Sequence, residues 1–405
     1  MVNKVQRTAS PASATPEWMP AVTVRHRRVL LALGWYAEAL HSGVARYAKT
    51  ANWALDASLL HDFEPSPDWY GDGIIWVAGV NPALDRFVRR WHKPVVNIGY
   101  TPTPDIPRVV SNPDAVMQMA VEHFQSRGFE HYAFYLHVDR PGPQVKMRAY
   151  ETAVKATEGT FHLIDLPKAR KHQQPHAQRA VYRWLADAIR QCPQPLAVVA
   201  ETDDPAIMIL HACVEAGIRV PEQVAVLGIN DDPLRCPLAS IPLSSIDDNM
   251  EQIGFKAAAI LDDLMSGKTT APPVTLIPPR GLTIRQSTDM LAVNNAAVSE
   301  ALRLIKTRFR EPVSAQSIAS EIPISQRQLH TEFVRITGRS IAEELARKRL
   351  DHAIRLLSGT DWKVSAIARQ SGLGNANRLC RTFKKIHGQT PLAFRRQAPP
   401  IIKDV

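Results

Sequence analysis

Two segments near the C-terminus carry polar side chains that are suited to reading DNA bases. Each contains a Leu and a Phe four positions apart, Leu329 with Phe333 and Leu379 with Phe383. In a helix this spacing places both apolar side chains on one face and leaves the opposite face polar. Arg pairs bidentately with guanine, and Asn or Gln with adenine, in the major groove. The predicted base-reading residues are Gln326, Arg327 and His330 in the first helix, and Asn375, Asn377 and Arg381 in the second. Further along the second helix, Lys384 and Lys385 are predicted phosphate contacts.

A short helix and a tight turn are expected before each of these segments. Val313–Ala319 and Val364–Leu373 both contain an Ile-Ala step and precede the polar helices. The pattern indicates two helix-turn-helix units that repeat after about fifty residues. Between them, Ser340–Leu357 has the apolar periodicity of one long amphipathic helix. Two such units can read successive major-groove segments about 34 Å apart along one face of a duplex.

The charge distribution supports a role in DNA binding. From Ala292 to the C-terminus the chain carries 20 Lys and Arg against 9 Asp and Glu, a net charge of +11. The whole chain carries 49 against 39, a net charge of +10, so the residues before Ala292 are almost neutral at −1. A basic module on a neutral body is typical of nucleic-acid binders, although a solvated basic surface alone would give the same count.

The segment from Ala292 to Arg396 resembles the AraC/XylS family of bacterial transcription regulators. The resemblance is closest over Phe383–Arg395 (FKKIHGQTPLAFR), which is similar to the C-terminal signature of the family. Within it, Gly388 suits a helix end and Pro391 a helix start. One departure is Arg378, which stands where many members have Tyr; this difference could add a phosphate contact or alter base choice. The resemblance implies an all-α double helix-turn-helix domain at residues 300–398, preceded by a linker at 286–299.

Length and composition favour two or three soluble domains in a chain of 405 residues. The first 24 residues lack an apolar core and are expected to be a disordered tail rather than a secretion signal. No apolar run approaches the ~18–20 residues needed to span a membrane. The four cysteines are scattered without metal-binding spacing, which indicates free thiols in a reducing cytoplasm: Cys192, Cys213, Cys236 and Cys380.

Between Arg25 and Arg285 short apolar runs alternate with amphipathic stretches. The predicted strands are Val29–Leu33, Gly73–Val77, Val95–Ile98, His131–Tyr135, Phe161–Ile164, Leu196–Ala200 and Val224–Gly228. The predicted helices are Leu40–Thr50, Pro82–Arg90, Asp114–Arg127, Met147–Ala156, Gln178–Gln191, Pro205–Glu215 and Met250–Met265. This alternation indicates parallel sheets covered by helices on both faces, and the length suits two lobes.

The same region resembles the ligand-sensing core of LacI/GalR repressors, which is related to periplasmic binding proteins. The resemblance is carried by Asp114–Gly128, Pro221–Asp232 and Leu243–Asp247. It implies a two-lobed α/β sensor at residues 25–285, with three chain crossings near Gly128, Asp247 and Leu276. The N-lobe would then comprise residues 25–128 and 248–275, and the C-lobe residues 129–246 and 276–285.

A sugar site in such a sensor needs charged or amide groups that grip hydroxyls and an aromatic ring for stacking. Arg148 is placed by the resemblance at the sugar-contacting Arg of the family, with a surface Arg as the alternative. Asp203 and Asp114 are candidates that could instead be helix N-caps. The remaining candidates follow predicted strands. Trp35 and Tyr36 are candidates for stacking on the sugar ring, although either could be a core residue, and Asn230 and Asp231 are candidates for binding its hydroxyls. Asn230 departs from the Asp usual in the family, which could shift ligand preference.

A LacI-like sensor followed by an AraC-like DNA-binding domain resembles the layout of xylose-operon regulators. It implies a cytoplasmic, nucleoid-associated activator with xylose or a related monosaccharide as effector, and with double-stranded DNA, RNA polymerase and a second copy of the chain as partners. A different sugar or sugar acid, or a small-molecule-binding module without a DNA role, remains as an alternative. The chain contains no Gly-x-Ser-x-Gly, phosphate-binding-loop or His-Glu-x-x-His motif, so neither an enzyme nor a cofactor or metal is expected.

Overall fold

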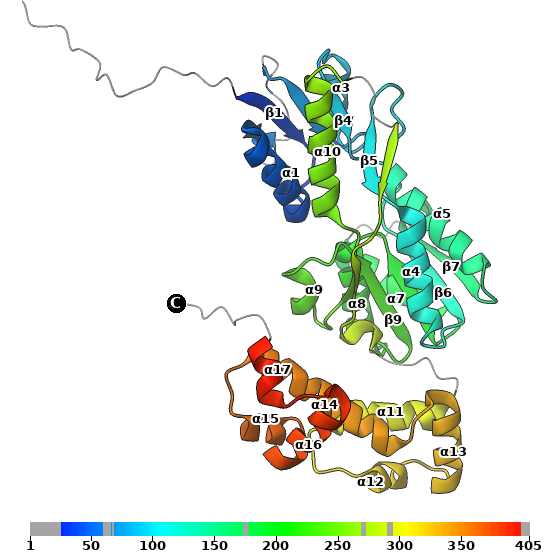
Figure 1. The fold of residues 1–405 in the computed structure, drawn as a ribbon. Helices are drawn as coiled ribbons and strands as arrows, with labels where there is room; N and C mark the ends of the chain where they lie inside the picture. The colour runs from blue at the N-terminus through cyan, green and yellow to red at the C-terminus, as the bar shows by residue number, and fades with distance from the viewer. Residues whose placement is uncertain are drawn as a thin grey trace, which may run out of the picture.

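Two six-stranded sheets, each covered by helices, are followed by a bundle of seven labelled helices in this computed structural model (Figure 1). The structure describes residues 26–59, 66, 69–172, 177–268, 273–289 and 295–397. The expected disordered tail lies outside the described residues. The predicted fold class, a two-lobed α/β region followed by an all-α domain, is confirmed.

The N-lobe is built on a parallel sheet with the strand order β11-β5-β4-β3-β1-β2. Its strands are β1 Arg27–Ala32, β2 Trp53–Asp56, β3 Gly73–Trp76, β4 Val95–Asn97, β5 Arg108–Ser111 and β11 Val274–Ile277. Helices α1 (Glu38–Ala51) and α10 (Met250–Met265) cover one face, where they bury Val29 and Leu31. Helix α3 (Pro82–Arg89) covers the other face and buries Leu30. Burial on both faces explains why β1 reads as a continuous apolar run.

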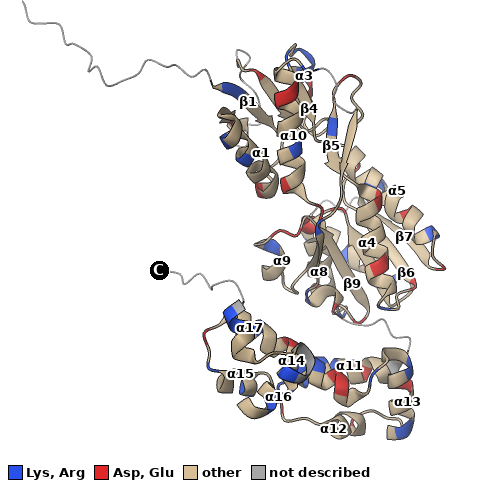
Figure 2. Cartoon of the chain, in the orientation of Figure 1, with Lys and Arg blue, Asp and Glu red and all other residues tan. Residues whose placement is uncertain are grey.

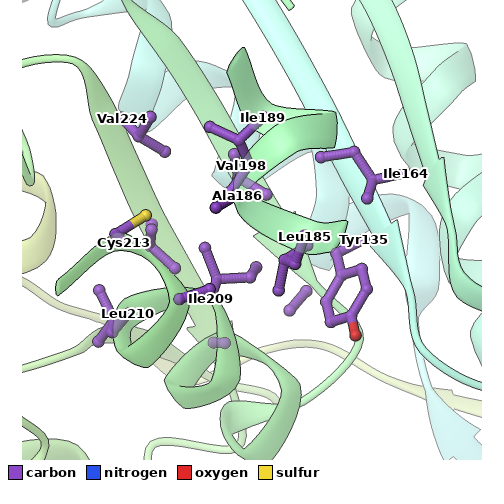
Figure 3. Close-up of a cluster of buried hydrophobic side chains, with 14 of the residues drawn as sticks. Tyr135, Ile164, Leu185, Ala186, Ile189, Val198, Ile209, Leu210, Cys213 and Val224 are labelled. Atoms are coloured by element: carbon purple, nitrogen blue, oxygen red, sulfur yellow. The ribbon is translucent and has the colours of Figure 1, made fainter. Parts of the chain in front are cut away.

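The C-lobe has the strand order β12-β10-β9-β8-β6-β7, with β12 antiparallel to β10. Its strands are β6 His131–Leu136, β7 Thr160–Asp165, β8 Leu196–Ala200, β9 Val224–Ile229, β10 Ser244–Asp247 and β12 Gly281–Thr283. Its helices are α4 Pro113–Gln125, α5 Pro141–Lys155, α6 Leu166–His172, α7 Gln178–Arg190, α8 Asp203–Glu215 and α9 Arg235–Leu238. Figure 3 shows one of its two apolar layers, in which Leu185 and Ile209 pack against Tyr135 and Val198 of the sheet. Helices α4 and α5 cover the opposite face.

The chain crosses between the lobes three times, and two crossings differ from the sequence prediction. The first lies at Asn112, not near Gly128, because the apolar face of α4 packs against α5 in the C-lobe. The second follows Asp247, where β10 ends and α10 of the N-lobe begins. The third lies at residues 278–280, slightly later than predicted, because β11 pairs with β5 through Ile277.

The three crossing segments are hydrogen-bonded to one another. The Asn112 N–H donates to the Ile277 carbonyl at 2.8 Å, and the Arg280 N–H donates to the Asp247 carbonyl at 2.8 Å. The Arg280 guanidinium also lies 3.1 Å from a Glu251 carboxylate oxygen at the start of α10. The connection between the lobes is therefore one narrow strip, called the crossing strip below.

The C-terminal domain has two apolar cores joined by one helix. Its helices are α11 Ala296–Arg308, α12 Ala315–Ser320, α13 Gln326–Thr337, α14 Ile341–Gly359, α15 Val364–Gln370, α16 Ala376–His387 and α17 Pro391–Gln397. Leu329 and Phe333 of α13 are buried in the first core, and Leu379 and Phe383 of α16 in the second. Helix α14 contributes its first half to one core and its second half to the other, so it fixes the spacing of the two units.

The predicted linker at residues 286–299 is shorter in the structure. The short 3-10 helix at Gln286–Thr288 belongs to the C-lobe, where Ser287 is buried and donates a hydrogen bond to the Val226 carbonyl at 2.6 Å. Helix α11 already begins at Ala296, capped by the Asn295 side chain. Both ends of the linker are thus fixed by polar side chains, one buried and one capping a helix. Polar residues in these roles leave no hydrophobic pattern in the sequence, so the linker bounds could not be predicted from it.

A buried arginine joins the two helix-turn-helix units. Arg349 of α14 donates to the carbonyls of Phe309, Glu311 and Val313, which lie at and after the C-terminal end of α11. Gly372, in the turn of the second unit, lies against the same place. It adopts φ +69°, and a Cβ atom there would lie 2.2 Å from the Phe309 oxygen.

We predict that Gly372→Ala destabilises the C-terminal domain more than Gly388→Ala. Both glycines adopt the left-handed backbone conformation, which costs a non-glycine residue about 1–2 kcal/mol. A Cβ atom at Gly388, however, would have no neighbouring atom within 4 Å. The clash at Gly372 should add about 1–3 kcal/mol. Urea unfolding of the fragment 295–405, followed by circular dichroism, measures both. Equal losses would show that the turn does not press against α11.

Candidate functional site

The predicted DNA-reading side chains lie on the exposed faces of α13 and α16. Gln326, Arg327 and His330 are exposed on α13, on the side opposite the buried Leu329 and Phe333. On α16 the exposed candidates are Asn377, Arg378, Arg381 and Lys384. The side chain of Lys385 lies outside the described residues. The polar faces predicted from the spacing are therefore present on both helices.

The start of each of these helices is fixed by a side-chain cap. The Ser325 hydroxyl accepts from the Gln328 N–H at 3.2 Å, and the Asn375 side chain accepts from the Arg378 N–H at 2.9 Å. The oxygen of Asn375 is therefore engaged with its own helix, which leaves its amide NH₂ as the group that can reach a base. Figure 2 shows Lys and Arg distributed along α14 and on α16.

Where the two lobes meet, polar side chains from both form one buried group. We call it the junction cluster: Tyr100, Ser111, Lys146, Glu201 and Asp248. The Tyr100 hydroxyl lies 2.6 Å from the Ser111 hydroxyl, and the Lys146 ammonium donates to the Glu201 carbonyl at 2.9 Å. Ser111 and Glu201 follow or end parallel strands, so the carboxyl ends of both sheets supply this group, as is usual for ligand sites in such folds.

Asp248 is the member of the cluster whose hydrogen bonding is incomplete. It is buried, and its Oδ1 atom has no hydrogen-bond partner in the structure. Burial raises the pKa of this carboxyl, whereas the nearby Lys146 ammonium and the Ser111 hydroxyl lower it. A buried acceptor without a donor is rare in folded proteins, and a ligand hydroxyl would complete it.

Glu201 provides a second buried carboxylate in the cluster. Its Oε2 accepts from the His137 N–H at 3.1 Å. Burial raises its pKa to about 7, with hydrogen bonding from His137 and the Lys146 charge acting in the opposite direction. The carboxyl therefore changes its protonation state near neutral pH.

Arg148, the residue expected to grip a sugar, does not lie in the junction cluster. It is exposed, and its Nε donates to Gln144 of its own helix at 3.3 Å. Lys146 occupies the buried face of α5 together with Ala149 and Tyr150. Two residues correspond to about 200° of rotation around a helix, so Lys146 and Arg148 point in nearly opposite directions. The periodicity of buried residues in α5 was the signal that could have identified Lys146.

Asp203, Asn230 and Asp231 lie together at the ends of β8 and β9, where they form a second polar group. Asp203 is buried, accepts from the Ser245 hydroxyl at 2.5 Å, and has its pKa raised to about 6 by burial. Asp231 pairs with Arg285 at 2.7 Å. Asn230 and Asp231 both have positive φ, 111° and 51°, an uncommon conformation for non-glycine residues. This group is bonded mainly within the C-lobe.

The other sugar candidates lie elsewhere. Asp114 is exposed in the first turn of α4, where Asn112 and not Asp114 provides the N-cap. Asp203 is not an N-cap either, because its oxygens bind Ser245 and the Asp232 N–H. Trp35 is half-buried against the N-lobe core, and Tyr36 is 60% exposed, next to His41.

Within the described part of the chain, no group of three or more His, Cys, Asp or Glu is arranged to hold a metal ion. No described helix is long and apolar enough to cross a membrane. All four cysteines are free thiols, with Cys213 and Cys236 buried.

Comparison with known proteins identifies both parts of the chain. Residues 121–288 match the periplasmic binding protein-like domain, and residues 318–397 match a helix-turn-helix domain. The xylose operon regulatory protein of Escherichia coli (strain K12) is 26% identical over 388 residues, which cover 92% of this chain and 97% of that protein. The protein of the same name from Haemophilus influenzae is 25% identical over 72% of this chain and 75% of its own length.

Solved structures support the same architecture. The xylose-binding transcription activator xylR superposes with a TM-score of 0.71 at 22% identity, over 93% of this chain and 100% of that one. A LacI family regulator from Enterococcus faecalis V583 with bound ribose matches 66% of this chain and 100% of its own, at a TM-score of 0.51 and 16% identity. The two resemblances inferred from residue patterns are thus confirmed as a periplasmic binding protein-like domain followed by an AraC-type helix-turn-helix domain.

We predict that the stability of the two-lobed region falls as the pH rises from about 4.5 to above 7. A carboxyl whose pKa is raised by folding stabilises the protein in its protonated form, and this contribution is lost as pH rises through the folded pKa. For Glu201, a pKa of about 7 against an ordinary 4.5 corresponds to about 3 kcal/mol. Asp203 adds to the same trend.

Glu201→Gln tests the assignment because an amide keeps the size and the acceptor but does not titrate. Melting temperatures measured between pH 5 and pH 8 should decline less in Glu201→Gln than in the parent protein. An identical decline in both would exclude Glu201 as a source of the pH dependence.

Proposed function

We propose that this chain, which joins a periplasmic binding protein-like domain to an AraC-type helix-turn-helix domain, is a sugar-responsive, sequence-specific transcription regulator. The observation that carries the proposal is that one chain holds two helices with exposed polar faces and, in a separate region, a buried polar cluster with an unmet hydrogen-bond acceptor. Binding of a small polar ligand by one part would then be read out as DNA binding by the other.

The ligand is proposed to be xylose or a related monosaccharide bound in the junction cluster. The Asp248 Oδ1 atom would accept a hydrogen bond from a hydroxyl, and Lys146 would donate to another. Xylose is supported by the names of two relatives. Lys146 would also suit the carboxylate of a sugar acid, so a panel of monosaccharides and sugar acids is needed to distinguish these ligands.

The DNA half of the function is supported by the exposed polar faces and the basic C-terminal segment. A second copy of the chain would bring four helix-turn-helix units onto paired half-sites, and RNA polymerase would be the partner of an activator in the cytoplasm. A small-molecule-binding module without a DNA role is the competing reading. That alternative does not account for the net charge of +11 in the last 114 residues.

Lys146→Met should weaken monosaccharide binding roughly ten- to a hundredfold, because a charged hydrogen-bond donor to a sugar contributes about 1.5–3 kcal/mol. Arg148→Met is the matched control: it removes a cation from the same helix two residues away, and sugar affinity should stay within about twofold. Isothermal calorimetry on the full chain measures both, with melting temperatures as the check on folding. Retained affinity in Lys146→Met together with a loss in Arg148→Met would restore the assignment made from the sequence.

Arg381→Ala should lower affinity for the cognate operator by about 1–3 kcal/mol and relax its base preference at one position. Lys384→Ala, one helical turn later, should weaken all sequences about equally and reduce the salt dependence of binding. Fluorescence anisotropy with cognate and scrambled duplexes at several salt concentrations separates the two effects. If Arg381→Ala weakens both duplexes equally, Arg381 contacts the backbone, and salt-insensitive binding by the parent chain would remove the DNA role.

A further inference from the structure

A cavity of about 230 Å³ lies between the C-lobe and the C-terminal domain. Ser126, Arg127 and Asp289 line it from the C-lobe side. Helices α11 and α14, with the turn before α14, line it from the other side through Leu302, Ile305, Lys306, Arg339, Glu344, Arg347 and Lys348. Figure 1 shows α11 and α14 on the side of the C-terminal domain that faces the C-lobe, with α12 and α16 farther away. The cavity thus lies apart from the proposed base-reading faces and from the junction cluster.

Positive charge dominates the cavity wall. Five of the lining residues are Lys or Arg and only two are acidic, Asp289 and Glu344. Those two carboxylates are already engaged: Asp289 with Lys348 at 2.5 Å, and Glu344 with Arg347 at 2.6 Å and Arg339 at 3.2 Å. Asp351 also pairs with Arg347 at 2.9 Å, so the nearby carboxylates balance most of the positive charge, and Arg127 is the lining cation without an ion pair among the described residues.

Arg127 is the cation with the poorest compensation. Its Nε donates to the Thr288 carbonyl at 3.0 Å and its Nη1 to the His123 carbonyl at 3.1 Å, and no described carboxylate forms an ion pair with it. Burial lowers its pKa, the charge of Asp289 acts in the opposite direction, and the charge of Arg347 lowers the pKa. The hydrogen-bond partners of Arg127 are thus neutral, and Asp289 is the carboxylate that partly offsets its charge.

Lys306, on the opposite wall, has a long ion pair. Its ammonium lies 3.5 Å from the Glu222 carboxylate, longer than the other ion pairs around the cavity. Burial lowers its pKa, while Glu222 and Asp289 raise it and Lys348 lowers it. Cations held close together in a partly buried space are costly unless an anion joins them.

We propose that this cavity is a binding site for a small phosphoryl-bearing anion, which bridges the C-lobe and the C-terminal domain. Arginine guanidinium groups bind phosphate oxygens bidentately, and two arginines from different domains, Arg127 and Arg347, flank the space. Its volume is far above the ~10–15 Å³ that one water needs, so a phosphoryl group with attached atoms or waters fits. The site is independent of the sugar and DNA sites proposed above.

Inorganic phosphate is the probe that tests the site on the full chain without DNA. Calorimetry should show saturable binding of one phosphate per chain, and the melting temperature should rise more than in sodium chloride of equal ionic strength. Arg127→Gln and Arg347→Gln should each weaken binding at least tenfold. Because Arg127 also holds the Thr288 carbonyl, Arg347→Gln keeps the test valid if Arg127→Gln fails to fold. Lys155→Gln, which removes an ion-paired cation from the surface of α5, should leave phosphate affinity unchanged.

Two further arms identify the source of the phosphoryl group and exclude the DNA face. A sugar phosphate that binds tenfold more tightly than inorganic phosphate would identify a phosphorylated metabolite, whereas equal affinity would identify free phosphate; both results support the site. Arg381→Ala should leave phosphate affinity intact. Binding that Arg381→Ala abolishes and Arg127→Gln does not, or no saturation up to about 20 mM phosphate, would overturn the proposal.

Discussion

The crossing strip is the constraint on which the arrangement of the lobes depends. All three connections pass through one place, where Asn112 is bonded to Ile277 and Arg280 to Asp247. Two bodies joined only through a narrow strip can change their relative angle by small backbone rotations there, while each core stays packed. Asp248 belongs to the second connection itself and is the buried acid with an unmet acceptor. A ligand bound to it acts directly on the segment about which the lobes would turn.

The third connection leads from the lobes to the helix-turn-helix units. After the strip the chain forms β12 and then the short helix at Gln286–Thr288, which is anchored in the C-lobe core. Asp289, the next residue, pairs with Lys348 of α14, and α14 spaces the two helix-turn-helix units. The C-terminal domain is thus attached to the C-lobe. In a dimer, a change in lobe angle would alter the separation of the DNA-reading units, and the ligand can shift the equilibrium only by its differential affinity for the two states.

The sequence predicts this fold well wherever a regular apolar pattern extends over many residues. The helices of the two helix-turn-helix units, the long helix between them and most apolar strands of both lobes follow from their spacing, because burial on one or two faces dictates residue type, whereas the start of α11 falls in the predicted linker. The short strands β2, β5, β10, β11 and β12 are not among the predicted strands, whereas the equally short β3 and β4, buried along their whole length, are. The site was predicted less well. The resemblance predicts Arg148 as the sugar-binding residue of α5, whereas Lys146 is the cation on the buried face of that helix. Asp248 and Glu201 are far apart in the sequence and join the same cluster only because the crossings bring their segments together.

The most direct test of the account is thermodynamic reciprocity between sugar and DNA. Coupling between two binding sites is one free energy, so a sugar that changes operator affinity by a given factor must have its own affinity changed by the same factor when the operator is present. Operator affinity of the full chain should be measured with and without saturating monosaccharide, and monosaccharide affinity with and without saturating operator. The account predicts two equal factors that differ from one, typically about 5- to 150-fold. Factors of one, with both ligands bound, would contradict the claim that the two-lobed region controls the DNA-binding domain.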